Sequence, residues 1–250
     1  MEIHRKLAES NSDVYLTNVA IVLNNLAILQ ADTNRRAEAE TGYVEALEIR
    51  RKLAATNPDA YLPDVATTLN NLAILQRKMN RHAEAEAGYT EALGIYRNLS
   101  ESNPDVYLSD VAGTLNSLAI LQFDTNRHAE AEAGFTEALE INRQFATSNS
   151  DAYLPSVAMV LSNLAELQAI TKRHTEAETN YAEVLAIYQR LAETNPGVYS
   201  SNVTATLNAL IDVKEKLAKT EEVADLKREL EEIEKACNPH GEMQNTEGEQ

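Results

Sequence analysis

Histidines at one phase of a repeating pattern are the first candidates for metal or acid–base chemistry in this chain. His82, His128 and His174 occupy equivalent positions, where the first copy of the pattern has Arg36. A metal site needs several ligands within a few ångströms of one ion. Packed helices lie about 10 Å apart, so equivalent side chains of successive helical repeats cannot share an ion. We therefore predict structural roles for these histidines in turns, and no metal site.

Paired glutamates are the second candidates for acid–base chemistry. The pattern Glu-x-Glu recurs in four copies, as Glu38/Glu40, Glu84/Glu86, Glu130/Glu132 and Glu176/Glu178. Residues two apart on a helix point in different directions, and acidic groups near a helix N-terminus favour its dipole. The chain also lacks a glycine-rich phosphate loop, a Ser/His/Asp set and a cysteine nucleophile, since Cys237 is its only cysteine. We predict no catalytic activity and no cofactor.

Net charge narrows the classes of partner. The 250 residues include 22 Lys and Arg against 39 Asp and Glu, for a formal net charge of -17. Nucleic acids and anionic membranes attract basic proteins, so this balance disfavours both as partners. The first residues lack the apolar run of a signal peptide, and we expect no stretch to approach the roughly 18 apolar residues of a spanning helix. These features predict a cytoplasmic protein whose partner is a protein or peptide, with basic residues among its contacts.

An internal repeat organises the chain. Five related phrases, NVAIVLNNLAILQ, DVATTLNNLAILQ, DVAGTLNSLAILQ, SVAMVLSNLAELQ and NVTATLNALIDVK, begin 46 residues apart, at Asn18, Asp64, Asp110, Ser156 and Asn202. A fixed period of this length predicts stacked supersecondary units, none of which can bury its apolar face alone.

Each repeat reads as two helices. Leu69, Leu72 and Ala73 share one face of a helix that we place at about residues 63–79, called helix A. A short turn at residues 80–82 precedes helix B, which we place at about residues 83–102 and which ends before a proline. The unit is thus an antiparallel helix pair, and stacked pairs predict an all-α solenoid.

Two recurring residues indicate how these helices pack. Glycine lies inside helix B at Gly42, Gly88 and Gly134, where it costs about 1 kcal/mol relative to alanine, so we expect a close approach of backbones there. An arginine precedes the glutamate pairs at Arg35, Arg81, Arg127 and Arg173. We expect these arginines to bind helix ends or neighbouring glutamates.

The same residues carry a family resemblance. Large, small and aromatic signature positions of tetratricopeptide repeats match Leu69, Leu72, Ala73, Ala85, Tyr89, Ala92 and Leu93. The segment LNNLAILQRKMNRHAEAEAGYTEALGIYR resembles the longer variety found in kinesin light chains and in bacterial repeat proteins. The resemblance covers about residues 17–236 and implies a right-handed superhelix of helix pairs. Twelve residues beyond the usual 34 are assigned here to a longer helix B and to the NPDxYLP connector.

This reading divides the chain into repeats with two atypical ends. The predicted units are a partial repeat with helix B only and a connector (1–16), repeats one to four (17–62, 63–108, 109–154 and 155–200), a degenerate capping repeat (201–236) and a disordered tail (237–250). Residues 1–8 align with 47–54, so Ile3 and Leu7 would lie on a poorly covered apolar face that could self-associate. A truncated array is the alternative. The cap is predicted from an apolar stripe of Val223, Leu226, Leu230 and Ile233 on an otherwise charged helix.

The concave face is the predicted working surface. The resemblance implies that helix A lines this face and that asparagines there bind peptide backbones. The predicted contact residues are Asn24, Ile28, Asn70, Ile74, Arg77, Lys78, Asn116, Ile120, Phe123 and Glu166. Amides can donate and accept hydrogen bonds to an extended peptide, so we name Asn24, Asn70 and Asn116 the asparagine ladder. The second asparagines, Asn25, Asn71 and Asn163, are expected to bridge helices.

Two functions remain open at this point. The first is a non-catalytic adaptor that binds a peptide segment of a partner in the groove. The second is a self-assembling scaffold, or the repeat portion of a larger multidomain signalling protein. The sequence names no partner for either.

Overall fold

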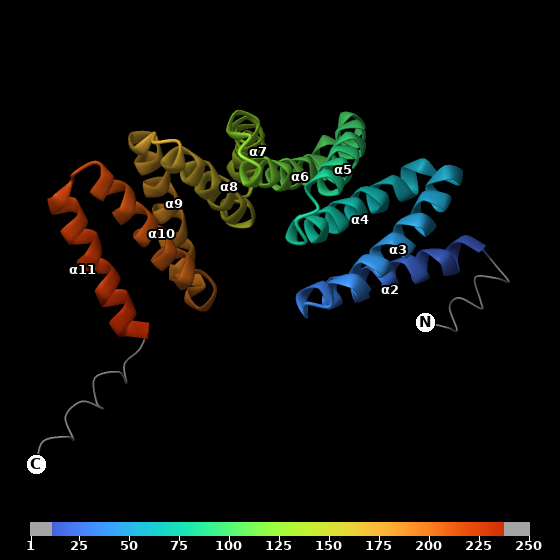
Figure 1. The fold of residues 1–250 in the computed structure, drawn as a ribbon, viewed down its shortest axis with the longest axis horizontal. Helices are drawn as coiled ribbons and strands as arrows, with labels where there is room; N and C mark the ends of the chain where they lie inside the picture. The colour runs from blue at the N-terminus through green and yellow to red at the C-terminus, as the bar shows by residue number, and fades with distance from the viewer. Residues whose placement is uncertain (1–11, 238–250) are drawn as a thin grey trace, which may run out of the picture. The chain divides into compact units, whose positions relative to one another are not determined.

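The computed structural model describes residues 12–237, and these residues form helices without any strand (Figure 1). Two compact units divide the chain, one ending at Ile141 and the other beginning at Asn142. The boundary falls within one helix, and each unit is described by itself. The predicted self-association residues Ile3 and Leu7 and the predicted tail beyond Cys237 lie outside the described residues.

The first unit is a run of helices in which each packs against the next. They are α2 (Ser12–Asp32), α3 (Arg36–Thr56), α4 (Pro58–Lys78), α5 (His82–Ser102), α6 (Pro104–Asp124) and most of α7 (His128–Ser148). Contacts join α2 to α3, α3 to α4, α4 to α5 and α5 to α6. The helices A also touch, α2 with α4 and α4 with α6. Antiparallel helix pairs, as predicted, therefore build this unit.

The second unit continues with α8 (Ser150–Ile170), α9 (His174–Thr194), α10 (Pro196–Lys216) and α11 (Thr220–Cys237). Each packs against its neighbour in sequence, from α8 to α11. On α11, Val223 is buried and Leu226, Leu230 and Ile233 are half-buried. The apolar stripe predicted for this helix is therefore its covered side.

Helix A begins earlier than we predicted. The structure starts α4 at Pro58 instead of near residue 63, and the connector NPDxYLP is part of the helix. Asn57 occupies the N-cap and Pro58 the first helical position, where a missing N–H costs nothing because that group has no intrahelical partner. Pro63 lies inside the helix and removes a single backbone donor. Both helices of a repeat therefore have 21 residues.

A left-handed residue ends each helix A. Asn80 has φ of 60°, and its N–H bonds to the carbonyl of Arg77, while the N–H of Arg81 bonds to that of Gln76. This pair of bonds satisfies carbonyls that the helix end would otherwise leave unpaired. Asn34 and Asn126 have the same conformation, which asparagine tolerates better than most residues. The predicted short turn is confirmed.

Close contact within each helix pair explains the glycines. A Cβ added to Gly88 would lie 3.1 Å from the Cβ of Ala73, and one added to Gly42 would lie 3.1 Å from that of Ala27. Gly134 meets Ala119 in the same way. In the fourth copy, Asn180 instead donates a 2.7 Å hydrogen bond to Gln168. The glycines therefore lie where the two helices approach closely, as predicted.

The recurrent turn arginines bind glutamates. Arg81 pairs with Glu40 of the preceding helix B and with Glu84 of its own turn, the latter at 3.0 Å. Arg127 repeats this pairing with Glu86 at 2.7 Å. The structural role predicted for these arginines is confirmed.

Another arginine row links successive helices B. Arg51 contacts Glu91 at 2.6 Å, and Arg97 contacts Glu137 at 2.7 Å within the first unit. In the second unit, Arg143 contacts Glu183 at 2.7 Å. These pairs join residues 40 positions apart, so they connect neighbouring repeats.

The first described helix carries more apolar surface than we expected. By length and composition, residues 13–32 could cross a membrane, so the expectation that no stretch comes near this limit was wrong. One such helix near an N-terminus is weak evidence for a span, and α2 packs against α3. Leu29 is 55% exposed, whereas its equivalent Leu75 on α4 is 2% exposed. The helix thus has one packed side and one open apolar side.

Substituting alanine at two glycines of α5 tests the close approach. We expect Gly88→Ala to lower the free energy of unfolding by about 1 kcal/mol, because overpacking outweighs the gain in helix propensity. Gly94 has open space around it, so Gly94→Ala should raise that free energy by about 1 kcal/mol. Chemical denaturation of both variants measures the difference, and equal stabilisation of the two would contradict the packing argument.

Candidate peptide-binding surface

A cavity of about 190 Å³ lies between two helices A of the first unit. Its lining comes from α2, α3 and α4 and consists of Ile28, Ala31, Asp32, Tyr43, Asn71, Ile74, Leu75 and Lys78. Three predicted groove residues, Ile28, Ile74 and Lys78, are thus brought together at one place. Tyr43 of helix B is buried, and contributes to the wall between the two helices A.

The isoleucines serve both surface and core. Ile28 is 39% exposed, while Ile74 is half-buried and packs against a core cluster that includes Ala73, Tyr89 and Leu121. Side chains in this position therefore present an apolar edge while their bases are held by the core. Such an edge can accept an apolar ligand side chain with little loss of conformational entropy, because the rotamers of the isoleucine side chains are already restricted.

The asparagine ladder is less accessible than predicted. Asn24 and Asn116 are 6% and 5% exposed, and Asn70 is half-buried. The amide oxygens of Asn24 and Asn70 are buried and have no hydrogen-bond partner. A peptide cannot reach these oxygens without a local opening. The second asparagine of the pair, Asn71, lines the cavity instead of Asn70.

Two other predicted groove residues, Arg77 and Phe123, contact neighbouring side chains. Arg77 forms a 2.7 Å ion pair with Asp124, which joins α4 to α6. Phe123 is half-buried, and its ring centroid lies 5.9 Å from that of His128 at the start of α7. Ile120 is also half-buried on α6. Of these residues, Arg77 and Phe123 have structural partners already, which reduces what they can offer a ligand.

The phased histidines lie at the start of helices B. His82, His128 and His174 are each the first residue of their helix, and each has a buried Nδ1 without a hydrogen-bond partner. Residues 12–237 contain no group of three or more His, Cys, Asp or Glu side chains that could hold a metal ion. These placements fit the structural role predicted for the histidines.

A second cavity, of about 330 Å³, lies in the second unit. Residues of α8, α9 and α10 line it, namely Ser162, Glu166, Tyr181, Tyr188, Asn202, Ala205, Thr206 and Ala209. Glu166 is exposed and stands at the position that isoleucine fills in α2, α4 and α6. The one predicted acidic groove residue therefore belongs to a cavity of its own unit.

Burial governs the electrostatics of the tyrosines in both cavities. Burial raises the pKa of Tyr43 to about 12, and the nearby Asp32 carboxylate adds to this effect. The pKa of Tyr181 is likewise raised to about 12, first by burial and then by Glu166 and Asp212. From the sequence, this position was identified only as an aromatic signature position, at Tyr89. The phase of these tyrosines beside the variable helix A positions was the signal for a role in the cavity walls.

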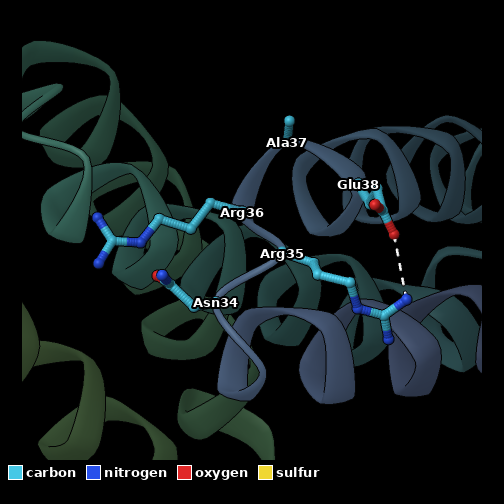
Figure 2. A pocket seen from close by; sticks show the side chains of 5 residues that line it. All are labelled: Asn34, Arg35, Arg36, Ala37 and Glu38. Atoms are coloured by element: carbon cyan, nitrogen blue, oxygen red, sulfur yellow. Dashed lines mark hydrogen bonds and ion pairs between the residues drawn. The ribbon is translucent and has the colours of Figure 1, made fainter.

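A surface hollow at the turn between α2 and α3 is a weaker candidate. It is lined by Asn34 and Arg35 of the turn and by Arg36, Ala37 and Glu38 at the start of α3 (Figure 2). Arg35 pairs with Glu38 at 3.2 Å, and Arg36 extends the other way and donates a 2.9 Å hydrogen bond to the carbonyl of Lys78. Arg35 and Arg36 therefore both have partners, and these contacts stabilise the turn.

Comparison with known proteins agrees with this architecture. Two family models, both described as tetratricopeptide repeat, match residues 18–98 and 157–196. Both of these segments of the chain therefore match tetratricopeptide repeats. No curated protein sequence matches the chain.

Solved structures share the fold of this chain. BtubC (BKLC) from P. vanneervenii is 25% identical over 95% of this chain and 87% of its own, with a TM-score of 0.74. A Podosopora anserina putative kinesin light chain with nearly identical TPR-like repeats is 15% identical over 92% of this chain and 100% of its own, at 0.69. A Rap protein complexed with Competence and Sporulation Factor is 15% identical, at 0.62, and the chain spans only 57% of it.

The family indicates the kind of work this fold performs. Tetratricopeptide repeat proteins are generally non-catalytic, and their fold is typical of protein-interaction modules. The predicted resemblance is confirmed, and each of the two cavities described above lies between neighbouring helices A of its own unit.

The stability of the protein at alkaline pH tests the burial of Tyr89. Burial raises the pKa of Tyr89 to about 12 and outweighs the opposing effect of the nearby Arg77. The unfolded chain loses this proton near pH 10, so the stability due to burial is present below pH 10 and is lost between pH 10 and 12. We expect Tyr89→Phe to lessen that loss by up to about 2 kcal/mol while leaving stability at pH 7 unchanged or higher. Denaturant unfolding across this pH range measures it, and parallel curves would contradict the prediction.

Proposed function

We propose that this chain is a non-catalytic adaptor that binds a peptide segment of a partner at the cavity between α2 and α4. The observation that carries this proposal is the meeting of Ile28, Ile74 and Lys78 from two neighbouring helices A around one cavity. A Rap protein of the same fold, complexed with Competence and Sporulation Factor, supports a binding role for the fold.

The lining suggests what the peptide brings to this place. Ile28 and Ile74 offer an apolar contact, and the amide of Asn71 offers a donor and an acceptor for a peptide group. Asp32 and Lys78 place opposite charges at the same cavity. An apolar ligand side chain flanked by polar groups matches this pattern, in which apolar contact supplies affinity and polar contacts fix orientation.

Further apolar contact is available along α6. Ile120 stands at the position equivalent to Ile74 and is also half-buried, and α4 touches α6. A peptide that leaves the cavity in this direction would pass the Arg77–Asp124 ion pair. Contact there would fix direction more than affinity, since partly exposed ion pairs contribute little free energy.

Peptide selection tests the proposed binding. A peptide selected against the wild type from a random displayed library should bind in the micromolar range, about -8 kcal/mol. Ile74→Asp and Lys78→Glu should each weaken it at least about tenfold, because they place charge in an apolar contact and reverse a charge at the cavity. The matched control, Thr90→Asp, changes an exposed residue of α5 and should leave affinity unchanged.

Fluorescence anisotropy with the synthetic peptide gives the affinities, and thermal unfolding of each variant separates lost binding from lost folding. Lys78 is exposed, so its variant should fold even where Ile74→Asp is destabilised. Unchanged affinity in folded Ile74→Asp and Lys78→Glu would overturn the proposed site.

Self-association is the second candidate function, favoured by the open side of α2. Val14, Ile21, Val22, Ile28 and Leu29 are exposed on one face of this helix. The positions equivalent to Val22 and Leu29 are buried on α4 as Thr68 and Leu75. Apolar surface of this kind often marks a protein interface, and a second copy of the chain would cover it.

The mass of the protein in solution, measured at several concentrations, tests the proposed self-association. The wild type should show a concentration-dependent rise in mass by light scattering, and Leu29→Lys should remain monomeric. Val198 is also exposed but belongs to α10, so Val198→Lys should behave as the wild type. A wild-type mass that stays at the 27.6 kDa of one chain at every concentration would exclude association through α2.

A further inference from the structure

We propose that the cavity of the second unit binds an arginine side chain of the partner, with its guanidinium facing Glu166, Asp212 and the hydroxyl of Tyr181. This inference rests on the proposed peptide binding and adds a second subsite with its own chemistry. The cavity is formed by α8, α9 and α10, whose consecutive packing is visible in Figure 1.

Two carboxylates from neighbouring helices A act on the same tyrosine, and of the two Glu166 lines the cavity. Glu166 lies on α8 and Asp212 on α10, and both raise the pKa of Tyr181. Both side chains are exposed, and neither forms an ion pair with a residue in the described part of the chain. Their negative charge is therefore available to a ligand.

Tyr181 supplies an observation that does not depend on the carboxylates. It is 6% exposed, lines the cavity and makes no hydrogen bond to another of residues 12–237. The residue as a whole is buried while its hydroxyl oxygen remains accessible, so this oxygen can accept a hydrogen bond from a ligand. A ligand N–H group that reaches this oxygen would satisfy it.

Nearby cations of the chain are engaged elsewhere. Lys214, two residues after Asp212, donates a 2.5 Å hydrogen bond to Glu178 and also pairs with Glu222. Lys219 binds Glu178 as well, at 2.7 Å. These lysines are held by the network between α9, α10 and α11, so they do not neutralise the cavity.

The remaining lining favours a guanidinium over an ammonium. Hydroxyl and amide oxygens come from Ser162, Asn202 and Thr206, and Tyr188 adds an aromatic ring that stacks on Tyr199 at a centroid distance of 6.2 Å. A guanidinium is planar, carries five donors and packs on aromatic faces, whereas an ammonium is a strongly hydrated point charge. Several acceptors around an aromatic wall suit the planar group.

A blocked tripeptide, Ac-Gly-Arg-Gly-NH2, tests the pocket independently of any partner. Titrated into the full chain and followed by NMR, it should bind with a dissociation constant on the order of millimolar. Its citrulline counterpart has the same shape without the charge and should not bind. Glu166→Gln and Asp212→Asn should each weaken arginine binding about tenfold, and added salt should weaken it further.

Two controls make the result specific. Glu193→Gln removes an exposed carboxylate elsewhere in the second unit and should leave tripeptide binding unchanged. Ile74→Asp disables the proposed site of the first unit but should also leave tripeptide binding unchanged, so the two proposals can fail separately. Equal binding of the citrulline or lysine tripeptide, or full affinity in Glu166→Gln and Asp212→Asn, would overturn the inference.

Discussion

Close approach of the two helices in a pair is the constraint on which the rest of this structure depends. In the first unit a glycine of helix B lies against an alanine of helix A, so an added Cβ would lie only 3.0–3.1 Å from the alanine Cβ. Tyr43 and Tyr89 of the helices B are buried in the same unit. Tyr43 lines the cavity between α2 and α4 from the side of α3.

Neighbouring repeats are held in register by a different kind of contact. The pairs Arg51–Glu91 and Arg97–Glu137 join successive helices B at the protein surface. Ion pairs this exposed contribute at most about 1 kcal/mol each, because water competes for both partners. Buried apolar residues therefore supply most of the stability, and the ion pairs select one alignment of neighbouring repeats over others. An arrangement that depends on recurring pairs needs the same residue spacing in every repeat.

The fold could be predicted from the sequence more closely than the candidate site could. Helix B was predicted almost to the residue, because the end is set by a proline and the start by the Asn80 turn. The start of helix A was misplaced because Pro63 was taken as a boundary, although a proline near a helix start removes only one donor. Repetition predicted the core well, since equivalent positions share one environment.

The exposure of each side chain determines whether it lines the candidate site, and this exposure depends on the neighbouring helix. Asn70 and Asn71 are adjacent in sequence and both are asparagine, yet only Asn71 lines the cavity. The amide oxygen of Asn70 is buried without a partner. The helical period places both asparagines near the same face of α4. A rotation of the helix by one residue decides which asparagine lines the cavity and which has a buried amide. The sequence alone does not determine that rotation, because it is set by packing against α2 and α5.

Variation at one helix A position shows how a constant core can present different chemistry. The position reads Ile28, Ile74 and Ile120 in the first unit, then Glu166 and Asp212 in the second. A buried tyrosine, Tyr43 or Tyr181, stands behind the position in both cavities. The two linings share this helix A position and the tyrosine, whereas most of their other residues come from different positions of the repeat. A change from isoleucine to carboxylate at the shared position therefore changes the chemistry of the cavity while the tyrosine is kept, and the two cavities can accept different ligand side chains.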